Sequence, residues 1–166
     1  MQHLAAPEFD IRPAWRLGDA AIEADAIAFW KRLGLLPPDV SPVTRAKELA
    51  AVAYRDGQLA GVMTAAIQRI DFLRARFAMI RGVVDPAYRR SYAVSALGGI
   101  ARDLIERWAE AHPEERVAGI GAVVETRQFD AFQKKPVWPN TRLAVAGYTP
   151  DGRQIRIAWF DHFRLD

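Results

Sequence analysis

Apolar residues recur along this chain with a helical period in some segments and an extended period in others, and these periods predict its elements. Between Ala20 and Leu33 the apolar positions recur every three or four residues, with Asp19 before the run and Gly34 after it. An acid at the N-cap and a glycine beyond the last turn are typical helix ends. Three further helices are predicted from similar signals: Val43–Leu49 after Ser41 and Pro42, Ser91–Ala111 before His112 and Pro113, and Thr126–Lys135 before Pro136.

Extended runs occupy most of the remaining chain. Ala51–Arg55 and Gln58–Ile67 are joined by Asp56 and Gly57, which predicts a hairpin with a tight primed turn. Val117–Val124 is almost wholly apolar, as expected of a central strand buried on both faces. The other predicted strands are Phe9–Pro13, Arg76–Val84, Arg142–Tyr148 and Arg153–Phe160.

The last predicted strand alternates in character. Arg153, Ile155, Ile157 and Trp159 fall on one side, and Gln154, Arg156 and Ala158 on the other. We expect the first set to form the apolar face. The complete order of elements is β-α-α-β-β-β-α-β-α-β-β, which indicates an α/β chain.

Composition limits the classes of function. A chain of 166 residues, 51% of them hydrophobic, fits a single domain over residues 1–166 with its own core. The absence of cysteine excludes a disulfide framework and a thiolate nucleophile, and the three histidines are too scattered to predict a metal site. No leader pattern and no apolar run of about 20 residues is visible, so we expect a cytoplasmic protein without a membrane partner.

The net charge of +3 comes mainly from arginines dispersed along the chain. Dispersed charge is typical of a solvated surface, and no nucleic-acid recognition motif is present, so we expect no nucleic-acid partner. Arginine also suits an anionic ligand such as a pyrophosphate, which it can bind with two parallel hydrogen bonds.

The segment from Arg81 to Leu97 runs from an apolar strand through a basic turn into a long helix. The free N–H groups and the dipole at a helix start favour a phosphate there, and Arg89 and Arg90 add full charges. The alternative is an ordinary basic helix start capped by Ser91.

This segment, with Val84-Asp-Pro86 followed by Arg89, resembles the acyl-CoA pyrophosphate loop of the GNAT superfamily of N-acyltransferases. The predicted element order also resembles the GNAT fold over nearly the whole chain. The resemblance implies a mixed, mostly antiparallel central sheet flanked by helices. It also implies an acyl-CoA co-substrate, most simply acetyl-CoA.

The resemblance further implies which residues bind the co-substrate. Backbone N–H groups of the turn, assisted by two arginines, would hold the pyrophosphate, and the preceding strand end would present backbone groups to the pantetheine arm. These residues are Gly82, Val83, Val84, Arg89, Arg90, Ser91, Tyr92, Ala93 and Val94. Tyr92 and Val94 stand where the family usually has glycine or another small residue. Gly82 is equally explained by tight packing.

Catalysis is where the sequence departs from the family. An asparagine commonly follows the second central strand, with a tyrosine seven residues later to protonate the leaving thiolate. Glu125 and Phe132 stand there. Glu125 is therefore a candidate base or a hydrogen-bond acceptor for pantetheine; its alternative role is to interact with the dipole of the following helix. Tyr148 is the candidate replacement acid, unless it is only a rim aromatic residue.

We therefore predict an acyl-CoA-dependent N-acyltransferase acting on a small-molecule or peptide amine. Two alternatives remain open: a non-catalytic CoA or nucleotide sensor, and a longer-chain amide synthase with an acyl channel near Trp138. The family resemblance also admits a homodimer formed through the C-terminal hairpin.

Overall fold

The computed structural model describes residues 8–89, 93–125 and 131–166. Its strands form one seven-stranded sheet in the order β1-β2-β3-β4-β5-β7-β6. Pairing of β4 with β5 is parallel, whereas β1–β2, β2–β3, β5–β7 and β6–β7 are antiparallel. The predicted α/β class with a mixed, mostly antiparallel sheet is therefore confirmed. The strands are β1 (Asp10–Pro13), β2 (Leu49–Arg55), β3 (Gln58–Ile70), β4 (Ala75–Val84), β5 (Val117–Val123), β6 (Ala144–Tyr148) and β7 (Gln154–Trp159).

The helices follow the predicted order. They are α1 (Ala20–Leu33), α2 (Pro42–Ala46), α3 (Ala93–Ala111) and α4 (Ala131–Lys134), with the short 3₁₀ helices η1 (Asp71–Leu73), η2 (Pro86–Tyr88) and η3 (Pro113–Glu115). The start predicted for α3 and most of the helix predicted from Thr126 lie outside the described residues. No helix in the described part of the chain is long and apolar enough to cross a membrane.

Two units divide the chain by their internal contacts. Unit 1 comprises Met1–Thr64 and Gly82–Ala101, and unit 2 comprises Ala65–Arg81 and Arg102–Asp166. Strands β3 and β4 and helix α3 contribute residues to both units because the boundaries fall within these elements.

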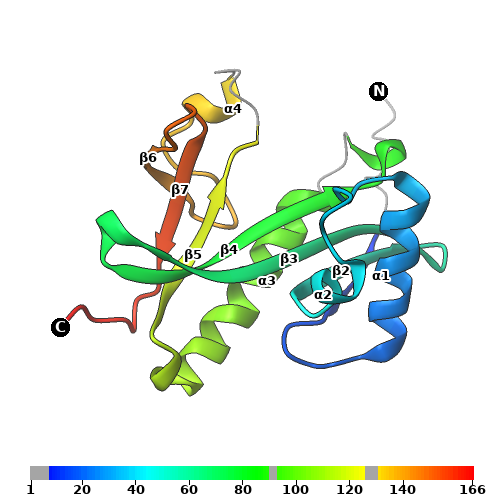
Figure 1. Cartoon of the computed structure of the whole chain (residues 1–166), viewed down its shortest axis with the longest axis horizontal. Coiled ribbons are helices and arrows are strands. Elements are labelled where there is room, and N and C mark those ends of the chain that lie inside the picture. The colour runs from blue at the N-terminus through cyan, green and yellow to red at the C-terminus, as the bar shows by residue number, and fades with distance from the viewer. Residues whose placement is uncertain (1–7, 90–92, 126–130) are drawn as a thin grey trace. The chain divides into compact units, whose positions relative to one another are not determined.

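In unit 1, α1 and α2 lie side by side over β2 and β3 (Figure 1). Asp19 caps α1 as predicted, since its Oδ1 accepts hydrogen bonds from the first-turn amides at 3.0 and 3.2 Å. Gly34 ends the helix in the left-handed conformation with φ of 62°. The core beneath is built from large apolar side chains of both layers, among them Ile22, Phe29, Trp30, Leu49, Val52 and Val62.

The hairpin of unit 1 has the predicted primed turn, with φ of 49° at Asp56 and 76° at Gly57. The predicted end of the second helix is wrong. This helix stops at Ala46, and Leu49 begins β2, where it pairs with Thr64 and is buried. Strand pairing and burial of Leu49 outweigh the local helical pattern.

In unit 2, β5, β7 and β6 lie next to one another (Figure 1). Glycines permit the close packing of β5: a Cβ at Gly119 would overlap the backbone carbonyl oxygen of Ala158 on β7. A Cβ at Gly121 would lie 2.6 Å from the Sδ atom of Met79. The predicted burial of the central strand is confirmed for Val117 to Gly121.

The predicted apolar face of β7 is wrong. Gln154, Arg156 and Ala158 are buried, whereas Trp159 is 39% exposed. The face is polar in sequence but satisfied in structure, because the Arg156 guanidinium donates hydrogen bonds to Gln154 Oε1 at 2.7 Å and to main-chain carbonyls of residues 133–143. Arg153 lies before the strand, in the turn.

Candidate functional site

The end of β4 and the first turn of α3 meet in unit 1. A Cβ at Gly82 would lie 2.9 Å from the Met63 Cε and 3.5 Å from the Val94 Cγ1. The structure therefore brings two predicted cofactor-binding positions, Gly82 and Val94, into contact. It also shows that packing alone explains the glycine. Along the same strand end, Val83 is half-buried and Val84 is buried.

A short turn follows β4 and leads toward α3. The amide of Asp85 donates to the carbonyl of Ala60 on β3 at 2.8 Å, and the Asp85 Oδ1 accepts from the amide of Ala87 at 2.9 Å. That backbone hydrogen bond, followed by the ion pair with Arg32, lowers the pKa of the Asp85 carboxyl below its usual value. Arg89 closes the turn and is exposed.

The rest of the predicted loop is only partly described. Arg90, Ser91 and Tyr92 lie outside the described residues, so the capping role of Ser91 stays a prediction. Ala93 is buried at the start of α3, and Val94 is exposed beside it.

Glu125 follows β5 in unit 2 and is held by two arginines that sequence reasoning did not connect with it. Its Oε1 lies 3.2 Å from the Arg81 Nη2, and its Oε2 lies 3.4 Å from the Arg153 Nη1. The side chain is still 61% exposed. Arg153 also pairs with Asp151 at 3.1 Å, and the hydrogen bond to Asp151 is the main cause that raises the pKa of Arg153. The four side chains form a balanced charged cluster.

Parallel pairing of β4 with β5 ends just before this cluster. The last paired residues are Met79 and Gly121, whereas β5 continues to pair with β7 as far as Val123 and Ile155. Arg81 lies two residues beyond Met79 on β4 and directly precedes Gly82. The Arg81–Glu125 ion pair therefore joins the two strands beyond the end of their paired register.

The second predicted catalytic residue, Tyr148, ends β6 and is 55% exposed. Its hydroxyl accepts a hydrogen bond from the Gln154 Nε2 at 3.4 Å. This geometry fits the rim position considered from the sequence. An exposed phenol can also exchange protons, so its catalytic role stays a prediction.

At the position where the family commonly has tyrosine, Phe132 is fixed in a stack of three side chains. Its ring centroid lies 4.3 Å from that of Trp138, and the Arg156 guanidinium carbon lies 4.2 Å from the Trp138 centroid on its ring. The Trp138 Nε1 donates to the Phe132 carbonyl at 2.9 Å. Phe132 is thus immobilised by its neighbours although half of it is exposed.

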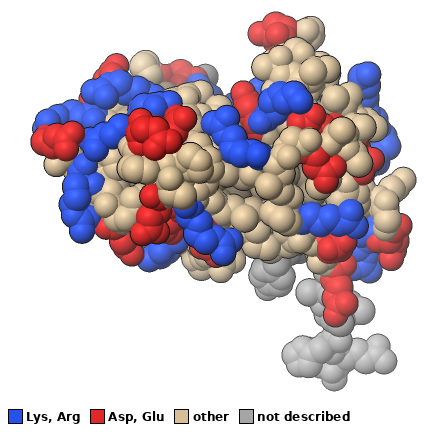
Figure 2. Space-filling view, turned by 90° about the horizontal axis from the view of Figure 1, so that it is seen from below, with Lys and Arg blue, Asp and Glu red and all other residues tan. Residues whose placement is uncertain are grey.

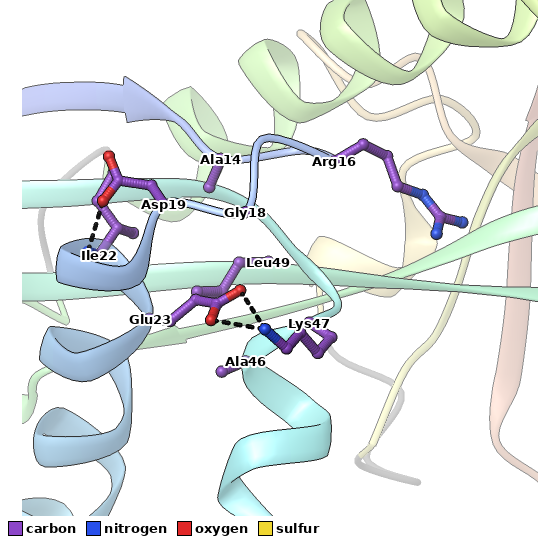
Figure 3. Close-up of a pocket in the computed structure, with 9 residues that line it drawn as sticks. All are labelled: Ala14, Arg16, Gly18, Asp19, Ile22, Glu23, Ala46, Lys47 and Leu49. Carbon is purple, nitrogen blue, oxygen red and sulfur yellow. Dashed lines mark hydrogen bonds and ion pairs between the residues drawn. The ribbon is translucent and has the colours of Figure 1, made fainter.

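A cavity of about 250 Å³ lies in unit 1, between the β1–α1 connection and the end of α2 (Figure 3). None of its nine lining residues is a predicted site residue. Lys47 and Glu23 point toward one another across it at 2.9 Å, while Arg16 extends away from that pair. Asp19 is already engaged by α1, so the acidic groups of this cavity are satisfied within the protein.

Surface charge and acid clusters add no further site. Figure 2 shows lysines and arginines interspersed with acids over the described residues of the visible face. Within the described ranges no group of three or more His, Cys, Asp or Glu side chains could hold a metal ion.

No protein-family model matches this chain, and no curated protein matches it either. Solved structures do. The yncA protein of Salmonella typhimurium, solved with its cofactor acetyl-CoA, matches with a TM-score of 0.65 at 13% identity, over 96% of this chain and 98% of that chain. A GNAT-family acetyltransferase from Streptococcus pneumoniae matches with a TM-score of 0.53 at 16% identity, over 92% of this chain and 99% of that one.

This chain has the GNAT fold. A third match supports the assignment: the AtaT toxin, solved with the C-terminus of its antitoxin AtaR, has a TM-score of 0.54 at 10% identity, with 92% of each chain covered. The resemblance inferred from element order is therefore confirmed at the level of the GNAT fold. At identities this low the comparisons establish the fold alone, so the chemistry must be argued from this chain's own residues.

Proposed function

We propose that this protein is an acyl-CoA-dependent N-acyltransferase that transfers an acetyl group to the amine of a small molecule or peptide. The observation that carries the proposal is the strand–turn–helix segment of unit 1, where Gly82 contacts Val94 and the turn ends in the exposed Arg89. The GNAT fold supports it, since the yncA structure contains acetyl-CoA.

The segment would bind the co-substrate at two places. Backbone N–H groups of Arg90–Val94, with the Arg89 and Arg90 side chains, would hold the pyrophosphate at the start of α3. Backbone groups of Gly82–Val84 would bind the pantetheine arm and the thioester oxygen, which gains negative charge as the amine attacks.

The chemistry requires two proton transfers. The amine nitrogen attacks the thioester carbon, a C–N bond forms, the C–S bond breaks, and CoA leaves as a thiolate. We assign Glu125 as the base that takes the proton from the amine, which must first displace one of the paired arginines. We assign Tyr148 as the acid that protonates the thiolate. A thiol has a pKa of about 8.5, so the thiolate is a good leaving group and the acid is the less critical of the two.

The assignment of Glu125 is tested by Glu125→Gln. Loss of a general base should lower turnover about 100-fold while CoA affinity is unchanged. Asp151→Asn is the matched control, because it removes a carboxylate from the same charged cluster without touching the proposed base. Equal turnover in the two variants would mean that Glu125 has only an electrostatic or structural role.

A specific observation favours a second candidate, a non-catalytic CoA sensor. Phe132 has no proton to give, and its stacking on Trp138 keeps it in place. The third candidate, a longer-chain amide synthase, is disfavoured because Trp138 has Phe132 on its ring at 4.3 Å and Arg156 at 4.2 Å, which leaves little open ring surface for an acyl chain.

Calorimetric titration with CoA tests the binding step that the enzyme and the sensor share. The unaltered protein should bind CoA, and replacing Arg89 and Arg90 together with Ala should cost about 1.5–3 kcal/mol for each charge-assisted bond lost. Unchanged affinity in the double variant would contradict the location of the pyrophosphate site.

A further inference from the structure

The turn that would receive the pyrophosphate begins with an acid. Asp85 lies four residues before Arg89, and a carboxylate so near an anion site would repel the phosphates. The structure neutralises this acid from a distant part of the sequence: the Arg32 Nη1 of α1 lies 3.1 Å from the Asp85 Oδ2. The Asp85 side chain is only 15% exposed.

The two oxygens of Asp85 have separate tasks. Oδ2 binds Arg32, while Oδ1 accepts the amide of Ala87 and so shapes the 3₁₀ turn that leads to Arg89. The Tyr88 amide then donates to the Asp85 carbonyl at 2.8 Å. A single residue therefore joins helix α1 to the backbone of the turn.

Further contacts hold both partners in place. The Arg32 guanidinium carbon lies 5.7 Å from the ring centroid of Phe29 on its own helix. The ring of Tyr88 meets Phe9 edge-to-face at 5.6 Å, and the Asp85 amide donates to Ala60 on β3. The turn is thus fixed by α1, by β3 and by the residue that precedes β1, all within unit 1.

We propose that Arg32 and Asp85 are a positioning pair that holds the 85–89 turn in the conformation that binds the CoA pyrophosphate. The inference rests on the proposed function and extends it to residues that would not touch the co-substrate. The positive charge of Arg32 offsets Asp85, so the acid can order the turn without opposing the ligand.

The test is the affinity for free CoA, measured by calorimetry, because the two explanations predict opposite signs for Asp85→Asn. If charge alone matters, removing an acid beside an anion site tightens CoA binding. If the pair positions the turn, the same substitution weakens binding by about fivefold to twentyfold. Asparagine keeps an oxygen for the Ala87 amide, so the variant is expected to fold.

Arg32→Ala should weaken CoA binding by about tenfold. Lys31→Ala is the matched control, since Lys31 is the adjacent exposed cation of α1 and its loss removes the same charge; we expect an effect of about twofold or less. The double variant Arg32→Ala with Asp85→Asn should be no weaker than the worse single variant. Arg32→Lys should recover most of the affinity, and turnover at saturating acetyl-CoA should stay within about twofold in every variant.

Two results would overturn the inference alone: CoA binding by Asp85→Asn that is as tight as in the unaltered protein or tighter, or an Arg32→Ala effect no larger than that of Lys31→Ala. If the unaltered protein fails to bind CoA, the proposed function falls and the positioning role falls with it. The first two results leave the proposed function standing, so the two failures are distinguishable.

Discussion

Arg156→Met should destabilise the protein markedly, although it removes a buried charge. The guanidinium is fully buried and has Gln154 Oε1 and the carbonyls of Gln133, Lys135 and Leu143 as hydrogen-bond acceptors, at 2.6–3.1 Å. Burial lowers the pKa of Arg156, which shows that the charge itself is held at a cost. Methionine relieves that cost but donates no hydrogen bond.

The magnitude follows from the acceptors left behind. Each lost hydrogen bond is worth about 0.5–1.5 kcal/mol net, or about 2–6 kcal/mol for the group. The carbonyls of Leu143 and Gln133 each keep a second donor, from the Trp138 amide and the Gln154 side chain. Relief of desolvation reduces the cost further, so we expect a loss of about 2–4 kcal/mol in the free energy of unfolding.

Urea denaturation at equilibrium measures this loss, with Arg116→Met as the control. Arg116 is half-exposed and pairs with Asp166 at 3.0 Å, so its replacement should cost about 1 kcal/mol or less. An Arg156→Met variant as stable as the control variant, or more stable than the unaltered protein, would refute the reasoning. It would mean that desolvation of the guanidinium outweighs its hydrogen bonds.

Three other substitutions give distinct results. Gly119→Ala should cost several kcal/mol in urea denaturation because its Cβ would overlap a carbonyl oxygen of β7, whereas Gly147→Ala meets only an ordinary 3.5 Å contact and should cost about 1 kcal/mol or less; similar losses would contradict this account. Burial and the hydrogen bond to Asp25 raise the pKa of Tyr54, so its contribution to stability is complete below pH 10 and is lost as pH rises further, a loss that Tyr54→Phe should abolish in denaturation series from pH 9 to 11. Phe132→Tyr should preserve the stacked ring and raise turnover by up to about 100-fold, measured as thiol release; unchanged turnover would place the acid elsewhere.

Features fixed by neighbouring residues could be predicted from the sequence. The bounds of α1 follow from Asp19 and Gly34, because a cap and a left-handed stop act within one turn. The primed turn at Asp56 and Gly57 is local in the same sense. Element order then identified the GNAT fold, because it requires only the type of each element.

Features that depend on distant partners could not be predicted. The buried face of β7 is decided by carbonyls of residues 133–143, which no alternation in the strand reveals. The two arginines on Glu125 come from β4 and from the turn before β7, and the charge of Asp85 is balanced from α1. Arg81 had one available signal, its place directly before Gly82 at the end of the predicted strand.

The central claim is tested most directly by thiol release from acetyl-CoA in the presence of a broad panel of amines, with the acylated product identified by mass spectrometry. The account predicts amine-dependent release that falls about 100-fold in Glu125→Gln and needs higher acetyl-CoA concentrations when Arg89 and Arg90 are both replaced. CoA binding without release of thiol from any acyl donor or amine would contradict the acyltransferase and identify the protein as a sensor.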